Sequence, residues 1–342
     1  MFGRENKKSV WYVITHKQKM NRKEYLNLVH RVSIFVALGF IASFAVFFII
    51  ALIGGLGRVV ALLLSSNLYI YSLAFIAVFL GYMLRFIKWN YYLKKLNVKV
   101  PIKKNLIVYM SMYSMNITPG KLGRILVAYT LNRITKKSMV NLIPVVTLDI
   151  FTDFLGFAIL ALITAIYFKT FVIYILIIDL ALILPFLFIL NDWLYKSLKK
   201  AFSKRRGLLK IFSMYGDEYF ASQSKLNTKW VYIVSLLVTV PAAFLNSMAL
   251  YFALYSIGVI PHIGSTVFAF SSAQLFGMVT GIPGNIGITD GALIALLHTS
   301  LNLSTGISSA LTIMTRFATL WFGLVLGGIF LIYSFRYWKA KV

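Results

Sequence analysis

Uncharged apolar runs constrain the fold of this chain more than any other feature. Several runs reach about 20 residues, which is the length that a helix needs to span the hydrocarbon core of a bilayer. Hydrophobic residues make up 60% of the 342 residues, whereas soluble domains contain about 45–50%. The sequence therefore predicts an all-α polytopic membrane protein, because a helix satisfies its backbone hydrogen bonds inside the bilayer.

Eight apolar segments are separated by polar or basic stretches. By residue number they cover 32–54, 68–92, 105–118, 140–167, 171–190, 230–257, 266–298 and 305–335. The first run is long and no small-residue cleavage site follows it, so we expect an anchor rather than a signal peptide. We expect a basic amphipathic arm (1–31), one transmembrane domain (32–342) and, within that domain, a basic interfacial linker (191–229).

Lysine and arginine are distributed unevenly, and their positions predict the topology. They total 35 against nine acidic residues, for a net charge of +26. They concentrate in the N-terminal arm and the C-terminal tail, and in three internal stretches: 85–104, 119–139 and 191–229. The loop expected at 55–67 carries only Arg58, and 230–315 carries none. Since cytoplasmic loops attract Lys and Arg, we place the basic stretches and both termini in the cytoplasm. Charge that follows one membrane face argues against nucleic-acid binding.

A Pro-Gly pair interrupts the apolar pattern twice. The first lies in MNITPGKLGR (115–124) and the second in TGIPGNIGITDGA (280–292). The topology requires that 105–118 and 266–298 enter the membrane and return to the side they came from. Irregular backbone survives at membrane depth only when it is buried in protein or lines a water-filled cavity.

Three expected spans separate the two breaks, so the breaks should open to opposite faces. The predicted fold therefore has about six full transmembrane helices and two oppositely oriented re-entrant helical hairpins that form an inverted repeat. Many transporters build a site near the bilayer midplane from such repeats and interrupted helices. Two ordinary interhelical turns are the alternative interpretation.

Charged residues inside apolar segments are costly unless they face the protein interior or a water-filled cavity. Asp149 and Asp153 are four residues apart and share one helix face. We interpret them as cavity lining or as partners of Arg124 or Arg133, with a purely structural salt bridge as the alternative. Asp290 and Arg316 are expected to pair or to face an outer cavity. There the guanidinium could instead bind a lipid phosphate through two donors.

Cations gather at the first break. Lys121, Arg124 and Arg133, together with free backbone N–H groups near the glycines, suit a phosphate. Ordinary attraction to anionic lipid at the cytoplasmic surface is the simpler alternative. The full set of candidate substrate-binding residues is Asn116, Thr118, Gly120, Lys121, Gly123, Arg124, Arg133, Asp149, Asp153, Pro283, Gly284, Asn285, Gly287, Asp290 and Arg316.

The sequence lacks the residue patterns that metal binding, nucleotide binding and nucleophilic catalysis require. The chain has no cysteine, and its four histidines show neither the H-x-x-x-H spacing nor a neighbouring carboxylate in a ligand pattern. We therefore expect no metal and no cofactor. A nucleotide-binding G-x-x-x-x-G-K-[ST] motif is missing, and no nucleophile–base pair is recognisable, so we do not expect an enzyme.

Five stretches occur in an order that resembles a known family. They are RFIKWNYYLKKLN (85–97), NITPGKLGR (116–124), TLDIFTDFLGF (147–157), IPGNIGITDGALIALL (282–297) and TRFATLWFG (315–323). Together they resemble the flippase-like transmembrane region of lysylphosphatidylglycerol synthases, the multiple peptide resistance factors, and its stand-alone bacterial and archaeal homologues. The chain ends soon after the last apolar run, so the aminoacyl-transferase domain of the synthases is expected to be absent.

The sequence departs from the pattern of this family at several positions. Arg124 stands where members carry a glutamate, and Asn285 and Asp290 stand at altered positions of the second motif. Asp149 and Ile150 replace a Glu-Arg pair in the third motif. Exchange of an anionic for a cationic residue could change the preferred headgroup.

The resemblance and the motifs together favour a lipid flippase or related transporter in the cell membrane. Its cargo would carry a phosphate, as a phospholipid, an aminoacyl-phospholipid or a polyprenyl-phosphate sugar. The expected partners are membrane lipids, mainly anionic, and a lipid-modifying enzyme or glycosyltransferase. One alternative is a small-solute secondary transporter. Another is a non-transporting membrane partner of a lipid-modifying or glycosyl-transfer enzyme.

Overall fold

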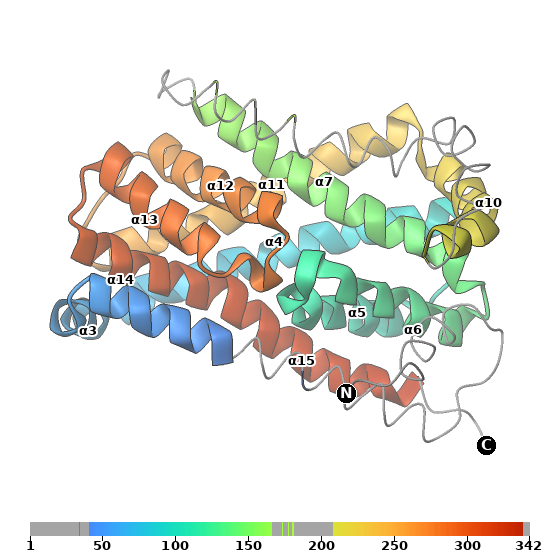
Figure 1. Cartoon of the computed structure of the whole chain (residues 1–342), viewed down its shortest axis with the longest axis horizontal. Helices are drawn as coiled ribbons and strands as arrows, with labels where there is room; N and C mark the ends of the chain where they lie inside the picture. The colour runs from blue at the N-terminus through green and yellow to red at the C-terminus, as the bar shows by residue number, and fades with distance from the viewer. Residues whose placement is uncertain are drawn as a thin grey trace.

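A computed structural model describes residues 41–165 and 208–337, together with the isolated positions 34, 173, 177 and 180. These ranges are helical and contain no strand (Figure 1). The expected arm at 1–31, the first part of the linker and, apart from the isolated positions, the span at 171–190 lie outside the described residues.

Five helices among the described residues are long and apolar enough to cross a membrane. They are α4 (Leu68–Lys95), α7 (Met139–Ala165), α11 (Lys229–Ser256), α12 (Ile263–Thr280) and the continuous helix Thr305–Tyr337. A bent helix pair raises the number to six if it forms one span. The predictions of an all-helical, multi-pass membrane protein and of apolar segments at 68–92, 140–167, 230–257 and 305–335 are thus confirmed.

The bent pair corrects the loop expected at 55–67. Helix Ile41–Ile53 is followed by α3 (Leu56–Ser65), and the two axes differ by 103°. Gly55 allows the bend because its φ of 82° lies in the left-handed region that glycine adopts without steric cost. The apolar pattern continues beyond the bend, and α3 packs against the later helix α14 (Thr305–Arg316). Residues 56–65 are therefore a second short helix.

The long helices pack into one bundle. Helix α4 lies along α11, and α7 contacts α11 and α12 (Figure 1). Their N-termini are defined by side-chain caps: Asn67 accepts from two amides of α4, and Thr228 accepts from Val231 of α11. Large side chains such as Trp89 and Phe268 are fully buried, whereas apolar side chains such as Leu237 are exposed on the outside. An apolar outer surface suits contact with lipid.

The first Pro-Gly motif lies between two short helices that contact each other. Helix α5 (Ile102–Ser111) continues into two 3₁₀ turns, η2 (Met112–Ile117) and η3 (Pro119–Arg124), which lead into α6 (Ile125–Thr135). Thr118 is extended, as the steric demand of a following proline requires. Its hydroxyl donates to the carbonyl of Met115 and accepts from the amide of Gly123, and these bonds hold the turn closed.

The second motif is a similar interruption. Helix α12 ends at Gly281, whose φ is 62°. A short 3₁₀ turn, η5 (Pro283–Asn285), follows, and α13 (Ile288–Leu301) then packs back against α12. Gly284 and Gly287 both have positive φ, at 64° and 83°, so glycine suits the geometry of both positions.

The two interruptions meet inside the bundle. Figure 1 shows α5 with α6 in one half of the molecule and α12 with α13 in the other half. The turn η5 contacts both η2 and η3. Helix α14 passes through a π-helical turn, η6 (Phe317–Trp321), beside the meeting point and continues as α15 (Phe322–Ser334). Three separate parts of the chain, the two breaks and the π-helical turn, therefore converge on one interior region.

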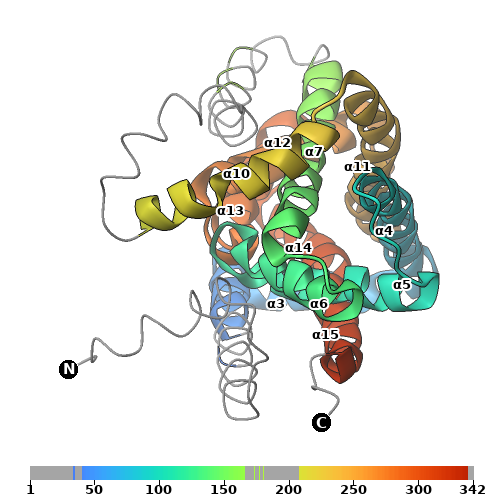
Figure 2. The same ribbon diagram turned by 90° about the vertical axis from the view of Figure 1, so that its right-hand side faces the viewer.

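The described part of the basic linker forms α10 (Leu208–Leu226). Figure 2 shows α10 crossing α7 at the end of the bundle that holds α5 and α6, and the two helices are in contact. Ser222 of α10 donates to Asn141 of α7, and Tyr219 shares a hydrogen bond with Thr147. This part of the linker is thus packed against the bundle.

Candidate functional site: a charged cavity between the two broken helices

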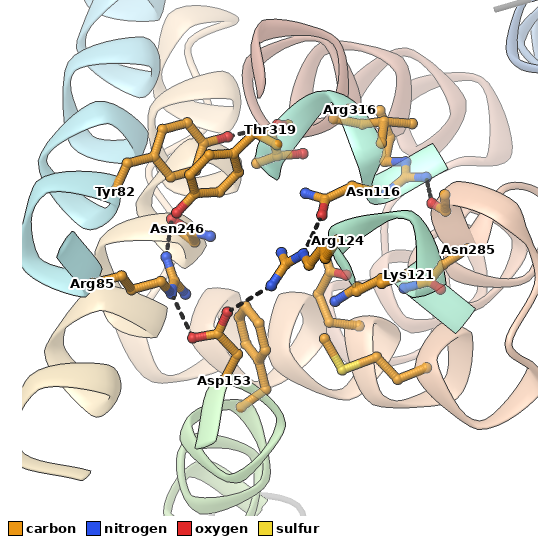
Figure 3. Close-up of a pocket in the computed structure, with 16 residues that line it drawn as sticks. Tyr82, Arg85, Asn116, Lys121, Arg124, Asp153, Asn246, Asn285, Arg316 and Thr319 are labelled. Atoms are coloured by element: carbon orange, nitrogen blue, oxygen red, sulfur yellow. Dashed lines mark hydrogen bonds and ion pairs between the residues drawn. The ribbon is translucent and has the colours of Figure 1, made fainter. Parts of the chain in front are cut away.

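A cavity of about 90 Å³ lies where the interruptions meet (Figure 3). This volume exceeds the roughly 10–15 Å³ that a single water needs. Its polar lining side chains are Tyr82, Arg85, Tyr113, Asn116, Lys121, Arg124, Asp153, Asn246, Gln274, Asn285, Arg316 and Thr319. Both Pro-Gly motifs therefore contribute to one site, although 164 residues separate Pro119 from Pro283.

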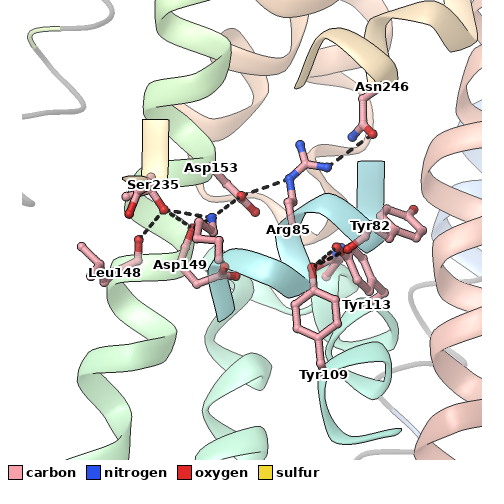
Figure 4. A network of polar contacts seen from close by, with 12 residues as sticks. Tyr82, Arg85, Tyr109, Tyr113, Leu148, Asp149, Asp153, Ser235 and Asn246 are labelled. Atoms are coloured by element: carbon pink, nitrogen blue, oxygen red, sulfur yellow. Dashed lines mark hydrogen bonds and ion pairs between the residues drawn. The ribbon is translucent and has the colours of Figure 1, made fainter. Parts of the chain in front are cut away.

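Two carboxylates of α7 form the anionic part of the site. Asp149 and Asp153 lie on one helix face and point into the protein, with 0% and 6% of their surfaces exposed. The ammonium of Lys88 lies 3.1 Å from Oδ1 of Asp149 and 2.8 Å from Oδ1 of Asp153. Arg85 also pairs with Asp153, at 3.1 Å (Figure 4).

Arg85 and Lys88 correct the sequence interpretation. The sequence pattern places them in a cytoplasmic basic stretch beginning at residue 85, but both lie inside α4 and are buried. Lys88 also donates to Thr152, so that its ammonium is surrounded by oxygen atoms. A signal was present in the sequence. Arg85 and Lys88 are three residues apart and Asp149 and Asp153 are four apart, and both spacings place the two side chains on one face of a helix.

Arg124 links the first break to the same acids. Its Nη1 lies 3.3 Å from Asp149 and 3.7 Å from Asp153, and its Nε donates to Asn116 at 2.7 Å. The guanidinium also lies over the ring of Tyr113. Of the two arginines considered as partners for the acids, Arg124 makes the contact. Arg133 lies in the last turn of α6 and is not among the residues lining the cavity.

A second ion pair fixes the other break. Nε of Arg316 lies 2.8 Å from Oδ1 of Asp290, and both side chains are buried. Arg316 also donates to the carbonyl of Gly284 at 2.7 Å. The remaining oxygen of Asp290 accepts the amide of Gly287 at 2.7 Å. The expected Asp290–Arg316 pair is therefore present and holds η5 against the end of α14.

The remaining candidate residues of the second motif divide into two groups. Gly284 and Asn285 line the cavity. Pro283 opens the 3₁₀ turn, and Gly287 caps α13, but neither lines the cavity. These two residues therefore shape the break and do not form the cavity wall.

The candidates of the first motif divide in the same way. Asn116 and Lys121 line the cavity. Thr118 and Gly123 form the turn: a Cβ at residue 123 would lie 2.7 Å from Cγ2 of Thr118, so the position requires glycine. Gly120 lies within η3.

Lys121 occupies the tip of this turn in a left-handed conformation, with φ of 58°. Its backbone amide donates to the carbonyl of Thr118 at 3.0 Å. Within the described part of the chain, no carboxylate forms an ion pair with its ammonium, in contrast to Arg85, Arg124 and Arg316. It is thus a cavity lysine without a carboxylate partner in the described ranges.

Aromatic and amide side chains complete the wall. The rings of Tyr82 and Tyr113 are 3.9 Å apart between centroids, and Tyr82 donates to the carbonyl of Thr319 in the π-helical turn. Arg85 donates to Asn246 of α11. Sequence reasoning missed Tyr82, Thr319 and Asn246. Their only signal was polarity within an apolar segment, which many structural residues share.

The described residues contain no group of three or more His, Asp or Glu side chains that could hold a metal ion. The charged groups described at the cavity include three that do not line it but pair with lining residues or with each other: Lys88, Asp149 and Asp290.

These features define a multi-pass helical membrane protein with a buried, charged cavity between two broken helix pairs. The sequence matches the family of lysylphosphatidylglycerol synthase transmembrane regions over residues 34–327, and the chain belongs to this family. The resemblance seen in the motifs is thereby confirmed. A comparison with proteins of curated function finds no match.

Proposed function

We propose that this protein moves a phosphate-bearing lipid between the two leaflets of the cell membrane. The observation that carries the proposal is that two broken helix pairs from opposite halves of the molecule meet at one cationic cavity. The cargo would be a phospholipid, an aminoacyl-phospholipid or a polyprenyl-phosphate sugar. Its headgroup would occupy the cavity while its acyl or prenyl tails remain in the bilayer.

The broken helices supply the means of access. In this proposal α5 with α6, and α12 with α13, are re-entrant hairpins that enter from opposite faces and form an inverted repeat. Alternating access then requires small movements of one hairpin against the other around a fixed site. The ion pair between Arg316 and Asp290 and the contact of Arg124 with Asp149 join each break to a crossing helix, so these pairs would move with the hairpins.

The charge distribution supports cytoplasmic termini. Removal of the buried Arg85 and Lys88 from the basic stretch still leaves Lys94, Lys95, Lys99, Lys103 and Lys104 near one end of α4. By contrast, residues 230–315, which include the loops proposed to lie on the opposite side of the membrane, contain no Lys or Arg. This asymmetry favours a cytoplasmic location for the end of the bundle that holds α5 and α6.

The side chains of the site are suited to binding. The cavity offers guanidinium and ammonium donors, which form strong charge-assisted hydrogen bonds with phosphate oxygens. Among the described residues, its carboxylates are held in ion pairs with lysine and arginine side chains. We therefore propose a non-catalytic transport domain, with membrane lipids as partners and a lipid-modifying enzyme or glycosyltransferase as the source of the cargo.

The test uses the purified full chain in proteoliposomes with tail-labelled fluorescent phosphatidylglycerol or a fluorescent polyprenyl-phosphate sugar. A membrane-impermeant reductant destroys the label in the outer leaflet only. The proposal predicts that the protected inner pool becomes accessible in vesicles with protein and stays protected in protein-free vesicles. If neither lipid becomes accessible in vesicles that contain folded protein, the proposal is wrong.

A small anionic solute is the second candidate, and the size of the cavity favours it. About 90 Å³ holds a compact anion more readily than a large headgroup. Uptake of radiolabelled phosphate into the same proteoliposomes, without movement of either labelled lipid, would support this alternative.

A further inference from the structure

The charges at the cavity do not balance. We count the charged groups that line the cavity or form an ion pair with a lining group. The cations are Arg85, Lys88, Lys121, Arg124 and Arg316, and the carboxylates are Asp149, Asp153 and Asp290. Counted at their ordinary charges, five cations against three carboxylates leave a net formal charge of +2 among the described residues.

Each carboxylate already has cationic partners inside the protein. Asp149 contacts Lys88 and Arg124, and Asp153 contacts these two and Arg85. Asp290 likewise contacts Arg316, and its second oxygen accepts a backbone amide. Each carboxylate of this set is therefore already paired with a cation of the protein.

One of the two surplus positive charges lies at Lys121, and the other is shared among Arg85, Lys88 and Arg124, which pair with only two carboxylates. Lys121 lines the cavity from the tip of the first break, and its side chain is partly exposed there. The pairs formed by Arg85, Arg124 and Arg316 hold those guanidinium groups at fixed positions, whereas the Lys121 ammonium forms no ion pair with the described carboxylates. A charge placed away from water without a counter-ion is costly, so an anionic ligand would stabilise this arrangement.

From this surplus of positive charge we propose that the cavity selects a lipid whose headgroup has a net negative charge. Lys121 binds the phosphate of this lipid, and a headgroup that carries an added amine is rejected. The inference rests on the proposed function and narrows its cargo to an anionic phospholipid or an anionic polyprenyl-phosphate. An aminoacyl ester would bring a cation into a cavity that is already positive, and repulsion between like charges would weaken its binding.

Binding to the purified full chain tests the selectivity without requiring transport. Native mass spectrometry would compare phosphatidylglycerol with its lysyl ester, both with the same acyl chains. We expect the wild-type chain to bind phosphatidylglycerol at least tenfold more tightly, corresponding to about 1.4 kcal/mol or more. Equal binding of the two lipids, or tighter binding of the lysyl ester, would overturn the proposal.

Lys136 provides a matched control for Lys121. Both lysines adopt a left-handed backbone, with φ of 60° and 58°, but Lys136 is exposed and lies outside the cavity. Lys121→Gln should reduce phosphatidylglycerol binding about tenfold, Lys121→Arg should retain it, and Lys136→Gln should leave it unchanged. An equal loss in Lys121→Gln and Lys136→Gln would show that the cavity position has no special role.

Two further arms separate the possible failures. Sodium phosphate at equal concentration should protect the chain from thermal unfolding less than phosphatidylglycerol does, and equal protection would overturn the assignment to a lipid. Selective binding without any translocation in proteoliposomes would support the selectivity and contradict the proposed transport. Translocation of both lipids at the same rate would support transport and overturn the selectivity.

Discussion

Arg316 and Asp290 form a buried ion pair, with Nε and Oδ1 2.8 Å apart, that joins the end of α14 to the first turn of α13. The pair also organises the backbone, because each partner bonds to a glycine of the second break. Arg316, which lies 32 positions beyond Gly284, thus fixes the conformation of the Pro-Gly motif. This relationship makes the motif part of the bundle interior.

The first prediction concerns this pair. Arg316→Leu and Asp290→Asn should each lower the free energy of unfolding by about 3–5 kcal/mol, because removal of one partner leaves the other charge buried and unpaired. The double variant should lose less than the sum of the two single losses. Chemical unfolding in detergent micelles measures all three. Losses below about 1 kcal/mol would mean that the pair is not buried.

The second prediction concerns Lys88, which the structure buries between two acids. Lys88→Met should destabilise the fold by about 3–5 kcal/mol, because Asp149 and Asp153 then lose a shared cation. Lys94→Met, on the same helix but exposed, should change stability by less than about 0.5 kcal/mol. Similar effects of the two substitutions would mean that Lys88 is not buried between the two acids and lies at the surface, as its position next to a basic stretch suggests.

A third prediction concerns the packing of α15 on the first break. A Cβ at Gly327 would overlap the backbone nitrogen of Ser114, whereas a Cβ at the neighbouring Gly328 meets nothing within 4 Å. Gly327→Ala should therefore destabilise the protein by about 1–3 kcal/mol. Gly328→Ala should be neutral or slightly stabilising, since alanine favours a helix. The thermal midpoints of the two variants provide the comparison, and equal midpoints would contradict the packing.

The fourth prediction concerns the two motif glycines. Gly120→Leu and Gly284→Leu should abolish lipid movement while leaving membrane insertion intact. At residue 284 the reason is a φ of 64°, which leucine adopts only with strain. Translocation in proteoliposomes, with protein content matched by immunoblot, measures the effect. If both variants move lipid at the wild-type rate, the two motifs are ordinary turns without a role in transport.

Much of the site was accessible from the sequence because membrane depth makes charges conspicuous. Asp149, Asp153, Asp290 and Arg316 stand out as isolated charges within apolar runs, and the cost of burial predicts that they face inward. The Asp290–Arg316 pair followed from the scarcity of other charges in that part of the chain. The two Pro-Gly pairs likewise indicated where the helices are broken.

Arg85 and Lys88 were missed because of their position in the sequence. They lie at the end of an apolar run, directly before a basic stretch, where Lys and Arg ordinarily mark the cytoplasmic interface. Only the packing of α4 beside α7 shows that they face Asp149 and Asp153. The contact between the two breaks was missed for a similar reason, since no local pattern encodes which distant turns meet.

The direction of the two broken pairs is measured most directly by single-cysteine labelling, because the natural chain has no cysteine. Lys136→Cys marks the open end of α6, and Asn302→Cys marks the C-terminal end of α13; both positions are exposed. A membrane-impermeant maleimide should label residue 136 only in inside-out vesicles and residue 302 only in intact cells. Labelling of both positions from the same side would contradict a cavity approached from opposite faces of the membrane.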